Sequence, residues 1–324
     1  MTNDVLKIDP VLAIDKIART MKQQIHKLRR RGTVIGLSGG IDSSVAAALC
    51  VHAVGADNTF GLLMPEHDSD PDSLRLGQVV ADALGIRTVI EDIGPILDAS
   101  GCYTRRDDYI RRMYPWYGPG CKCKLVLPSA IEGGYNLSWL VVQSPDGKEQ
   151  RARPPLDVYL GIVAASNMKQ RTRKGIEYYY ADRLNYVVIG TPNLLEYDQG
   201  FFVKNGDGAA DLKPIAHLYK SQVYQLAGAL DIPDEIRHRL PTTDTYSLPQ
   251  TQEEFYFSLP YDKMDLCLFA VNNEIPADEV APLVGLTISQ VNMVYRDIAS
   301  KRRATVYQHS APLLIEPVSI TTGS

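Results

Sequence analysis

The sequence lacks a long apolar run, a strong excess of one charge and an even set of cysteines. No stretch approaches the roughly 20 consecutive apolar residues that span a bilayer. The 324 residues carry a net charge of only −4, which argues against a general nucleic-acid-binding protein. The five cysteines suggest no secreted disulfide framework, and the N-terminus lacks the layout of a signal peptide. These absences predict a cytoplasmic protein with no membrane or nucleic-acid partner.

Strand-like and helix-like segments alternate along much of the chain. Buried strands are expected at residues 33–37, 59–64, 86–92 and 186–190, and helices at 11–28, 43–54, 73–85 and 156–180. Beyond about residue 233 the pattern is mostly helical, with strand-like character only near 304–318. Strands that alternate with helices form parallel sheets covered on both faces. The predicted fold class is therefore α/β, a doubly wound parallel sheet with a helical C-terminal portion.

The alternation stops between about residues 101 and 155. This segment includes "NLSWLVVQSPDGKEQRARPP", which is typical of a β-hairpin around a Pro-Asp-Gly turn. We expect it to be an insertion in a single domain that spans residues 1–324. Cys102, Cys121 and Cys123 invite a metal site, but structural zinc sites usually take four ligands at C-x₂₋₄-C spacing. Ordinary loop cysteines are the favoured interpretation.

A loop rich in glycine and serine, "SGGIDSS", joins the first strand to a helix. Backbone N–H groups and the positive end of the helix dipole converge there, which favours an anion. Ser38, Ser43 and Ser44 add hydroxyl donors. The carboxylate of Asp42 fits beside a phosphate mainly if a cation such as Mg²⁺ lies between them. The chain has no G-x-x-x-x-G-K-[ST] motif, so this is not the usual P-loop, and an N-capped helix is the plain alternative.

This loop resembles the pyrophosphate loop of the ATP pyrophosphatases, which cleave ATP between the α and β phosphates. A longer segment, "VVIGTPNLLEYDQGFFVKNGDGAADLKPIAHLYKSQV", resembles the ammonia-dependent NAD synthetase family. In that family the corresponding segment has roughly the pattern G-T-x-x-x-x-E, then F-x-K-x-G-D-G-x-x-D, then P-I-x-x-L-x-K. Three shorter segments, "SNMKQRTR", "LPTTD" and "YDKMDLCL", are similar to further motifs of the family. The resemblance covers nearly the whole chain outside residues 101–155.

The resemblance implies roles for individual residues. The ATP-binding residues would be Gly36, Leu37, Ser38, Gly39, Gly40, Ile41, Asp42, Ser43, Ser44, Thr191, Lys220 and Thr242. The second substrate, which is deamido-NAD in the family, would be bound by Arg171, Lys204, Asp207, Asp211 and Lys301. Asp42 and Glu196 would be ligands of Mg²⁺. Asp42 and Lys220 would act in catalysis, because charge on a departing pyrophosphate needs cations already in place.

The implied activity is a ligase reaction in two steps. The carboxylate of deamido-NAD attacks the α-phosphate of ATP, which gives an acyl-adenylate and pyrophosphate. Ammonia then attacks the activated carbonyl, which releases AMP and forms NAD. No glutaminase segment is recognisable, so the ammonia would be free or would come from a separate donor. The family resemblance also implies a homodimer.

The chain departs from the family pattern at several positions. Ser300 precedes Lys301, where the family has a His-Lys pair on a loop that touches the dinucleotide. Two alternatives therefore stay open: an amide ligase on the same scaffold that acts on another carboxylate, and a non-catalytic nucleotide-binding protein. The paired carboxylates of Asp42 and Glu196 argue against the second. Taken singly, Lys220 could also be an exposed helix lysine and Asp211 a helix N-cap.

Overall fold

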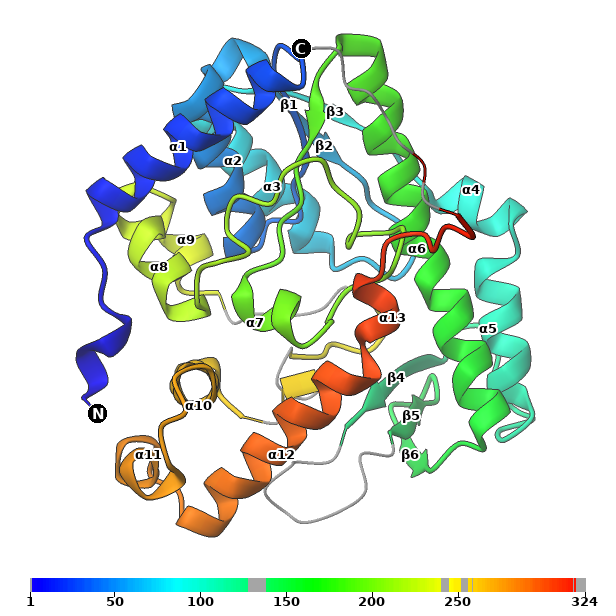
Figure 1. Ribbon diagram of the computed structural model, residues 1–324. Helices are drawn as coiled ribbons and strands as arrows, with labels where there is room; N and C mark the ends of the chain where they lie inside the picture. The colour runs from blue at the N-terminus through cyan, green and yellow to red at the C-terminus, as the bar shows by residue number, and fades with distance from the viewer. Residues whose placement is uncertain are drawn as a thin grey trace.

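A four-stranded parallel sheet lies at the centre of the computed structural model, which describes residues 2–127, 138–239, 245–251, 256–257, 259–316 and 318. Its strands are β1 (Thr33–Gly36), β2 (Thr59–Leu63), β3 (Arg87–Ile90) and β7 (Val187–Val188). They are ordered β3-β2-β1-β7 (Figure 1). Thr33 pairs with Thr59 on one side and with Val187 on the other, both in parallel. The carboxyl ends of these strands therefore meet at one edge of the sheet.

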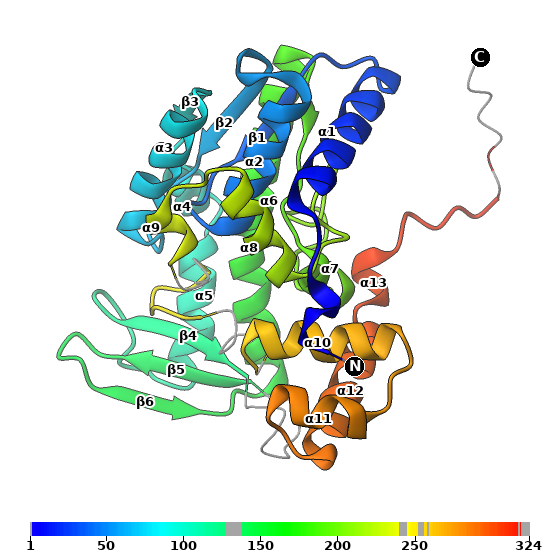
Figure 2. The same cartoon turned by 90° about the vertical axis from the view of Figure 1, so that its left-hand side faces the viewer.

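Helices cover both faces of this sheet, which confirms the doubly wound α/β fold (Figure 2). Side chains alternate along β1: Val34 packs in a core with Phe60, whereas Ile35 packs in a core with Leu49. The core around Ile35 draws on α1 (Pro10–Lys27), α2 (Ile41–Val54), α3 (Pro71–Leu84), α8 (Lys220–Ala229) and α9 (Asp234–Arg237). The core around Val34 draws on α4 (Gly94–Ala99), α5 (Cys102–Arg111) and α6 (Leu156–Leu184).

Residues between α5 and α6 form a second, antiparallel sheet of β4 (Lys122–Val126), β5 (Trp139–Gln143) and β6 (Glu149–Ala152). The expected hairpin is confirmed, since Gln143 pairs with Glu149 across the Pro-Asp-Gly turn. A buried cluster that includes Tyr117, Leu140 and Ile162 joins this sheet to α5 and α6. The segment expected to be an insertion thus packs against α6 through a small shared core.

The C-terminal portion is helical, as expected. It comprises α10 (Tyr261–Asn272), α11 (Ala277–Val284), α12 (Ile288–Ala304) and α13 (Val306–His309). The strand-like character expected near 304–318 was wrong. Val306 begins a short helix, and the following described residues lead away from the body of the molecule, where no strand edge lies beside them (Figure 2).

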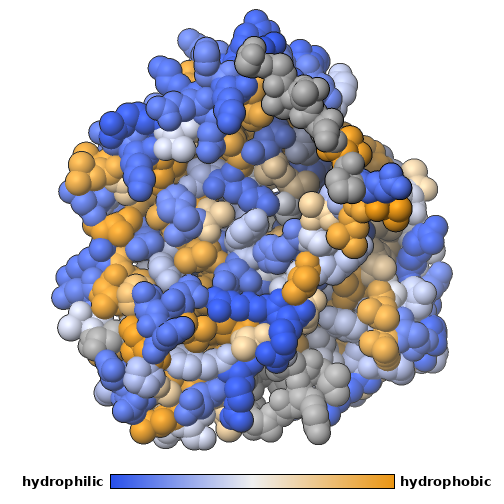
Figure 3. All heavy atoms as spheres, in the orientation of Figure 1, coloured by the Kyte–Doolittle hydropathy of each residue, from blue (hydrophilic) through white to orange (hydrophobic). Residues whose placement is uncertain are grey.

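Three short elements complete the described structure: α7 (Leu194–Asp198) and the 3₁₀ helices η1 (Asn3–Leu6) and η2 (Ala56–Asn58). On the face drawn in Figure 3, hydrophobic residues form separate patches among hydrophilic ones. Among the residues that the structure describes, no helix combines the length and the apolar composition needed to cross a bilayer.

Candidate active site

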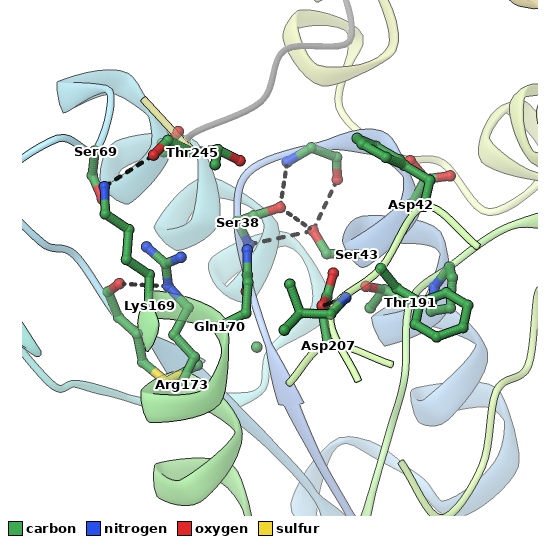
Figure 4. A pocket seen from close by; sticks show the side chains of 18 of the residues that line it. Ser38, Asp42, Ser43, Ser69, Lys169, Gln170, Arg173, Thr191, Asp207 and Thr245 are labelled. Atoms are coloured by element: carbon green, nitrogen blue, oxygen red, sulfur yellow. Dashed lines mark hydrogen bonds between the residues drawn. The ribbon is translucent and has the colours of Figure 1, made fainter. Parts of the chain in front are cut away.

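One large cavity, of about 830 Å³, opens at the carboxyl ends of β1, β2 and β7. Ligands of open α/β sheets bind at this edge. Its lining includes these residues expected from the sequence: Gly36, Leu37, Ser38, Gly40, Ile41, Asp42, Ser43, Thr191, Glu196, Asp207 and Lys220. Several of them are drawn in Figure 4. Gly39 and Ser44 belong to the same loop without lining the cavity, and Thr242 lies outside the described residues.

The loop after β1 is compact and is held by hydroxyl groups. Gly39 has a φ of 73°, and a Cβ there would lie 2.7 Å from the Cβ of Leu76. The hydroxyls of Ser38 and Ser43 are 3.1 Å apart, and Ser43 Oγ donates to the carbonyl of Gly40 at 3.0 Å. These bonds fix the turn that leads into α2. The backbone amides at the start of α2 are thereby ordered to receive an anion.

Asp42 is held between a lysine and an asparagine. Lys220 Nζ donates to Oδ2 of Asp42, and Asn193 Nδ2 donates to Oδ1 at 3.1 Å. Asn193 is also the N-cap of α7, where it exchanges two backbone–side-chain hydrogen bonds with Glu196, each 3.1 Å long. This capping box brings Glu196 to the neighbourhood of Asp42. Burial and the charge of Asp42 raise the pKa of Glu196 to about 8.

Lys220 is buried, so it is not an exposed helix lysine. Its side chain is 2% exposed, against 16% for Asp42. It begins α8, whose first amides are capped by Asp265: Ser221 N donates to Oδ2 at 2.7 Å, and Lys220 N donates to Oδ1 at 3.3 Å. Burial alone would lower the pKa of Lys220, but the charges of Asp42 and Glu196 raise it. The ammonium therefore stays charged next to the phosphate-binding loop.

The chemistry of Asp42 and Glu196 fits magnesium. Both supply hard carboxylate oxygens, which Mg²⁺ prefers. In the described part of the chain, no group of three or more His, Cys, Asp or Glu side chains could hold a metal ion by itself. Mg²⁺ commonly uses one or two carboxylates together with substrate phosphates. The pair thus suits an ion that binds together with a nucleotide.

A buried charge network on α6 was missed by the sequence analysis. Lys169, whose side chain is 2% exposed, donates to Glu66 Oε1 at 3.1 Å, Asp68 Oδ2 at 2.6 Å and the carbonyl of Thr245 at 3.0 Å. Arg106 also pairs with Asp68. Burial by itself would raise the pKa of Asp68. The positive charges of Lys169 and Arg106 outweigh this effect and lower that pKa below its ordinary value. The network joins α5, α6 and the loop after β2 at the cavity.

Arg173 is a second lining residue that the sequence analysis did not assign. It donates from Nε to the carbonyl of Met64 at 3.3 Å, at the end of β2. The signal was present, because Lys169 and Arg173 are four residues apart in "SNMKQRTR" and so share one helix face. Only Arg171 of that segment was assigned, and it does not line the cavity.

Three other residues were expected to bind the second substrate. Asp207 lines the cavity, whereas Lys204 and Arg171 do not. Asp207 accepts from Val203 N at 2.7 Å. Lys204 Nζ donates to the carbonyls of Tyr307 and Ser310, both at 2.8 Å, and so anchors the end of α13. Arg171 Nε donates to the carbonyl of Lys204 at 3.2 Å. In the described structure these two cations therefore support the C-terminal segment.

Asp211 and Lys301 also lie outside the cavity lining. Asp211 is not a helix N-cap, because its Oδ2 accepts from the backbone of Val188 in the sheet at 2.8 Å. Lys301 is buried and binds Asp297 at 2.8 Å and the carbonyl of Tyr256 at 2.6 Å. Burial lowers the pKa of Lys301. Asp211 thus ties its loop to β7, and Lys301 ties α12 to Tyr256.

The three cysteines of the 101–155 segment act as hydrogen-bonding or core thiols. Cys102 Sγ donates to the carbonyl of Ala165 at 3.2 Å, and Cys121 Sγ accepts from a backbone amide at 3.4 Å. Cys123 is fully buried in the core of the second sheet, and burial raises the pKa of its thiol.

Comparison with known proteins agrees with this geometry. A family model described as NAD synthase matches residues 13–110 and 154–309. A protein named NH(3)-dependent NAD(+) synthetase, from Rhizobium meliloti, is 66% identical over 97% of this chain and 95% of its own length. Two solved structures share the fold: an NMN synthetase from Francisella tularensis (TM-score 0.65, 23% identity, 95% and 99% coverage) and an NH3-dependent NAD synthetase from Campylobacter jejuni (TM-score 0.62, 24% identity, 95% and 100% coverage).

Proposed function

The chain belongs to the NAD synthase family, and from this premise we propose that it is an ATP-dependent ligase that forms NAD from deamido-NAD and ammonia. The carboxylate of deamido-NAD attacks the α-phosphate of ATP, so that an acyl-adenylate forms and pyrophosphate leaves. Ammonia then attacks the acyl carbon and AMP departs. The relatives' name, NH(3)-dependent NAD(+) synthetase, supports ammonia as the nitrogen donor.

One observation carries the proposal: a phosphate-binding loop, a buried lysine and a carboxylate pair share a single cavity. The loop amides with Ser38 and Ser43 would bind the phosphates that leave. The Lys220 ammonium would offset the negative charge that grows on pyrophosphate. Catalysis would come from positioning and charge stabilisation, with no side chain as a nucleophile.

Asp42 and Glu196 would hold Mg²⁺ with the nucleotide. When bound, the ion would neutralise phosphate charge in the transition state. Asn193 would orient both carboxylates, because its side-chain amide donates to Asp42 and its backbone amide donates to Glu196 Oε2. Lys220 forms an ion pair with Asp42 and would share this carboxylate with the ion.

The test is a reaction of the purified protein with ATP, Mg²⁺, ammonium and deamido-NAD. NAD, AMP and pyrophosphate should appear in equal amounts. Asp42→Asn should lower the rate by about 10²-fold or more, since it removes a carboxylate ligand of the Mg²⁺ ion that would neutralise charge at the transferring phosphates. Asp146→Asn, an equivalent change in the exposed hairpin turn, is the matched control and should retain full activity. Absence of NAD from the wild-type reaction would refute the proposal.

A second candidate is the same chemistry on a smaller acid, the deamido mononucleotide. The observation in its favour is that Lys301, at the position where the family touches the dinucleotide, is buried against Asp297 and Tyr256. The same assay with nicotinic acid mononucleotide separates the two candidates. A higher kcat/KM for the mononucleotide would favour the second.

We further propose a homodimer located in the cytoplasm, supplied with free ammonia or by a separate donor protein. Light scattering of the purified chain would give the mass of the particle. A monomer at micromolar concentration that is fully active would contradict the dimer.

A further inference from the structure

The segment from Thr245 to Thr251 lies along the edge of β4. Leu248 N donates to the carbonyl of Cys123 at 3.1 Å, and Cys123 N donates to Ser247 Oγ at 2.9 Å. Gln250 Nε2 donates to the carbonyl of Leu125 at 2.5 Å. The open edge of the β4–β6 sheet is thus occupied by a segment that is distant in sequence.

The side chains of this segment are buried with the sheet. Tyr246 is 4% exposed and packs in the same core as Leu125 and Leu140. Leu248 and Gln250 are also buried. The segment is therefore an integral part of the sheet's packing, and its position depends on the sheet.

The same segment forms part of the cavity wall. Thr245 and Tyr246 line the cavity, beside Leu125 of β4. The carbonyl of Thr245 accepts from Lys169 on α6 at 3.0 Å, a bond drawn in Figure 4. The wall is thus clamped from two sides, by α6 and by β4.

Figure 4 shows which side of the site this wall occupies. Thr245 and Lys169 lie on one side of Ser38, whereas Asp42 and Thr191 lie on the other. The side of Asp42 would receive the phosphates and their metal ion. The wall at Thr245 would then face the nucleoside of ATP.

We propose that the β4–β6 sheet is a positioning element for the ATP site, and that Ser247 and Gln250 are its positioning residues. Their bonds to β4 fix the Thr245–Tyr246 wall against the nucleoside. The inference rests on the proposed function only for the identity of the ligand, ATP. Loss of either bond should loosen the wall without changing the groups that stabilise pyrophosphate.

The experiment compares Ser247→Ala and Gln250→Leu with wild type. Both variants should raise the KM for ATP, and its Kd by calorimetry, by up to about fivefold, which is the limit reached if the full energy of one hydrogen bond is lost from ATP binding. The kcat at saturating ATP should stay unchanged. Ser247→Thr keeps the hydroxyl acceptor and should restore the wild-type KM. Gln143→Ala, at the hairpin end of the central strand β5, is the matched control and should leave ATP binding unaltered.

Two results would overturn the inference. One is an unchanged Kd for ATP in both edge variants, even if their thermal midpoints fall, since the segment would then only stabilise the fold. The other is an equal rise in Kd for Gln143→Ala. Failure of the proposed function is distinguishable, because it would appear as absent NAD formation by wild type while calorimetry still measures ATP binding.

Discussion

Binding of magnesium with nucleotide should strengthen as the pH rises, because Glu196 must lose its proton to become a ligand. Burial and the charge of Asp42 raise the pKa of Glu196 to about 8. At pH 7 about nine in ten Glu196 side chains are then protonated when no metal is bound. A metal ion requires the carboxylate form, so binding releases this proton. The apparent Kd should therefore fall about 25-fold between pH 6.5 and 8.5 and level off at higher pH.

The assay is calorimetry with Mg²⁺ and the non-cleavable α,β-methylene analogue of ATP. Titrations at pH 7 in two buffers of different ionisation enthalpy should show release of about 0.9 proton from the protein. Glu196→Gln is the control, because it keeps the size of the side chain and an acceptor for Asn193 N but cannot ionise. Subtracting its proton release removes the contribution of the nucleotide itself. The same pH dependence in wild type and in Glu196→Gln would refute the reasoning.

Three further changes test other parts of the site. Lys220→Met should lower kcat about 10²- to 10³-fold in a pyrophosphate-release assay, because it removes the buried cation beside the phosphate loop; an unchanged kcat would contradict that role. Asp265→Ala should lower the free energy of unfolding in urea by about 2 kcal/mol, because the amides of Lys220 and Ser221 lose their cap. Gly39→Ala should abolish measurable ATP binding, since its Cβ would lie 2.7 Å from that of Leu76 at a φ of 73°; wild-type affinity would show that the loop can shift.

The sequence predicted the parts of the molecule whose conformation depends on residues that are close together in the chain. The strand–loop–helix at Ser38 and the position of Glu196 are encoded within a few residues, by glycine conformation and by a capping box. The alternation of strands and helices was sufficient to predict a parallel sheet with helices on both faces.

Contacts between distant segments were not predictable in the same way. Lys204, which the sequence predicts to bind the substrate, donates to the carbonyls of Tyr307 and Ser310, and no local pattern in the sequence indicates these contacts. Lys169 carries no local signal of its partners, because Glu66 and Asp68 come from the loop after β2. Strand-like composition near Val306 was likewise overridden, because β propensity is expressed only where a sheet edge is available.

The cavity draws its lining from almost the whole described chain, from Gly36 at the end of the first strand to Gln308 in the last described helix. During synthesis the phosphate loop emerges early, whereas the residues that complete the enclosure leave the ribosome much later. A nascent chain can therefore form the central sheet long before it can retain a nucleotide. Ligand binding would stabilise only finished molecules, and so would distinguish complete chains from interrupted ones in the cell.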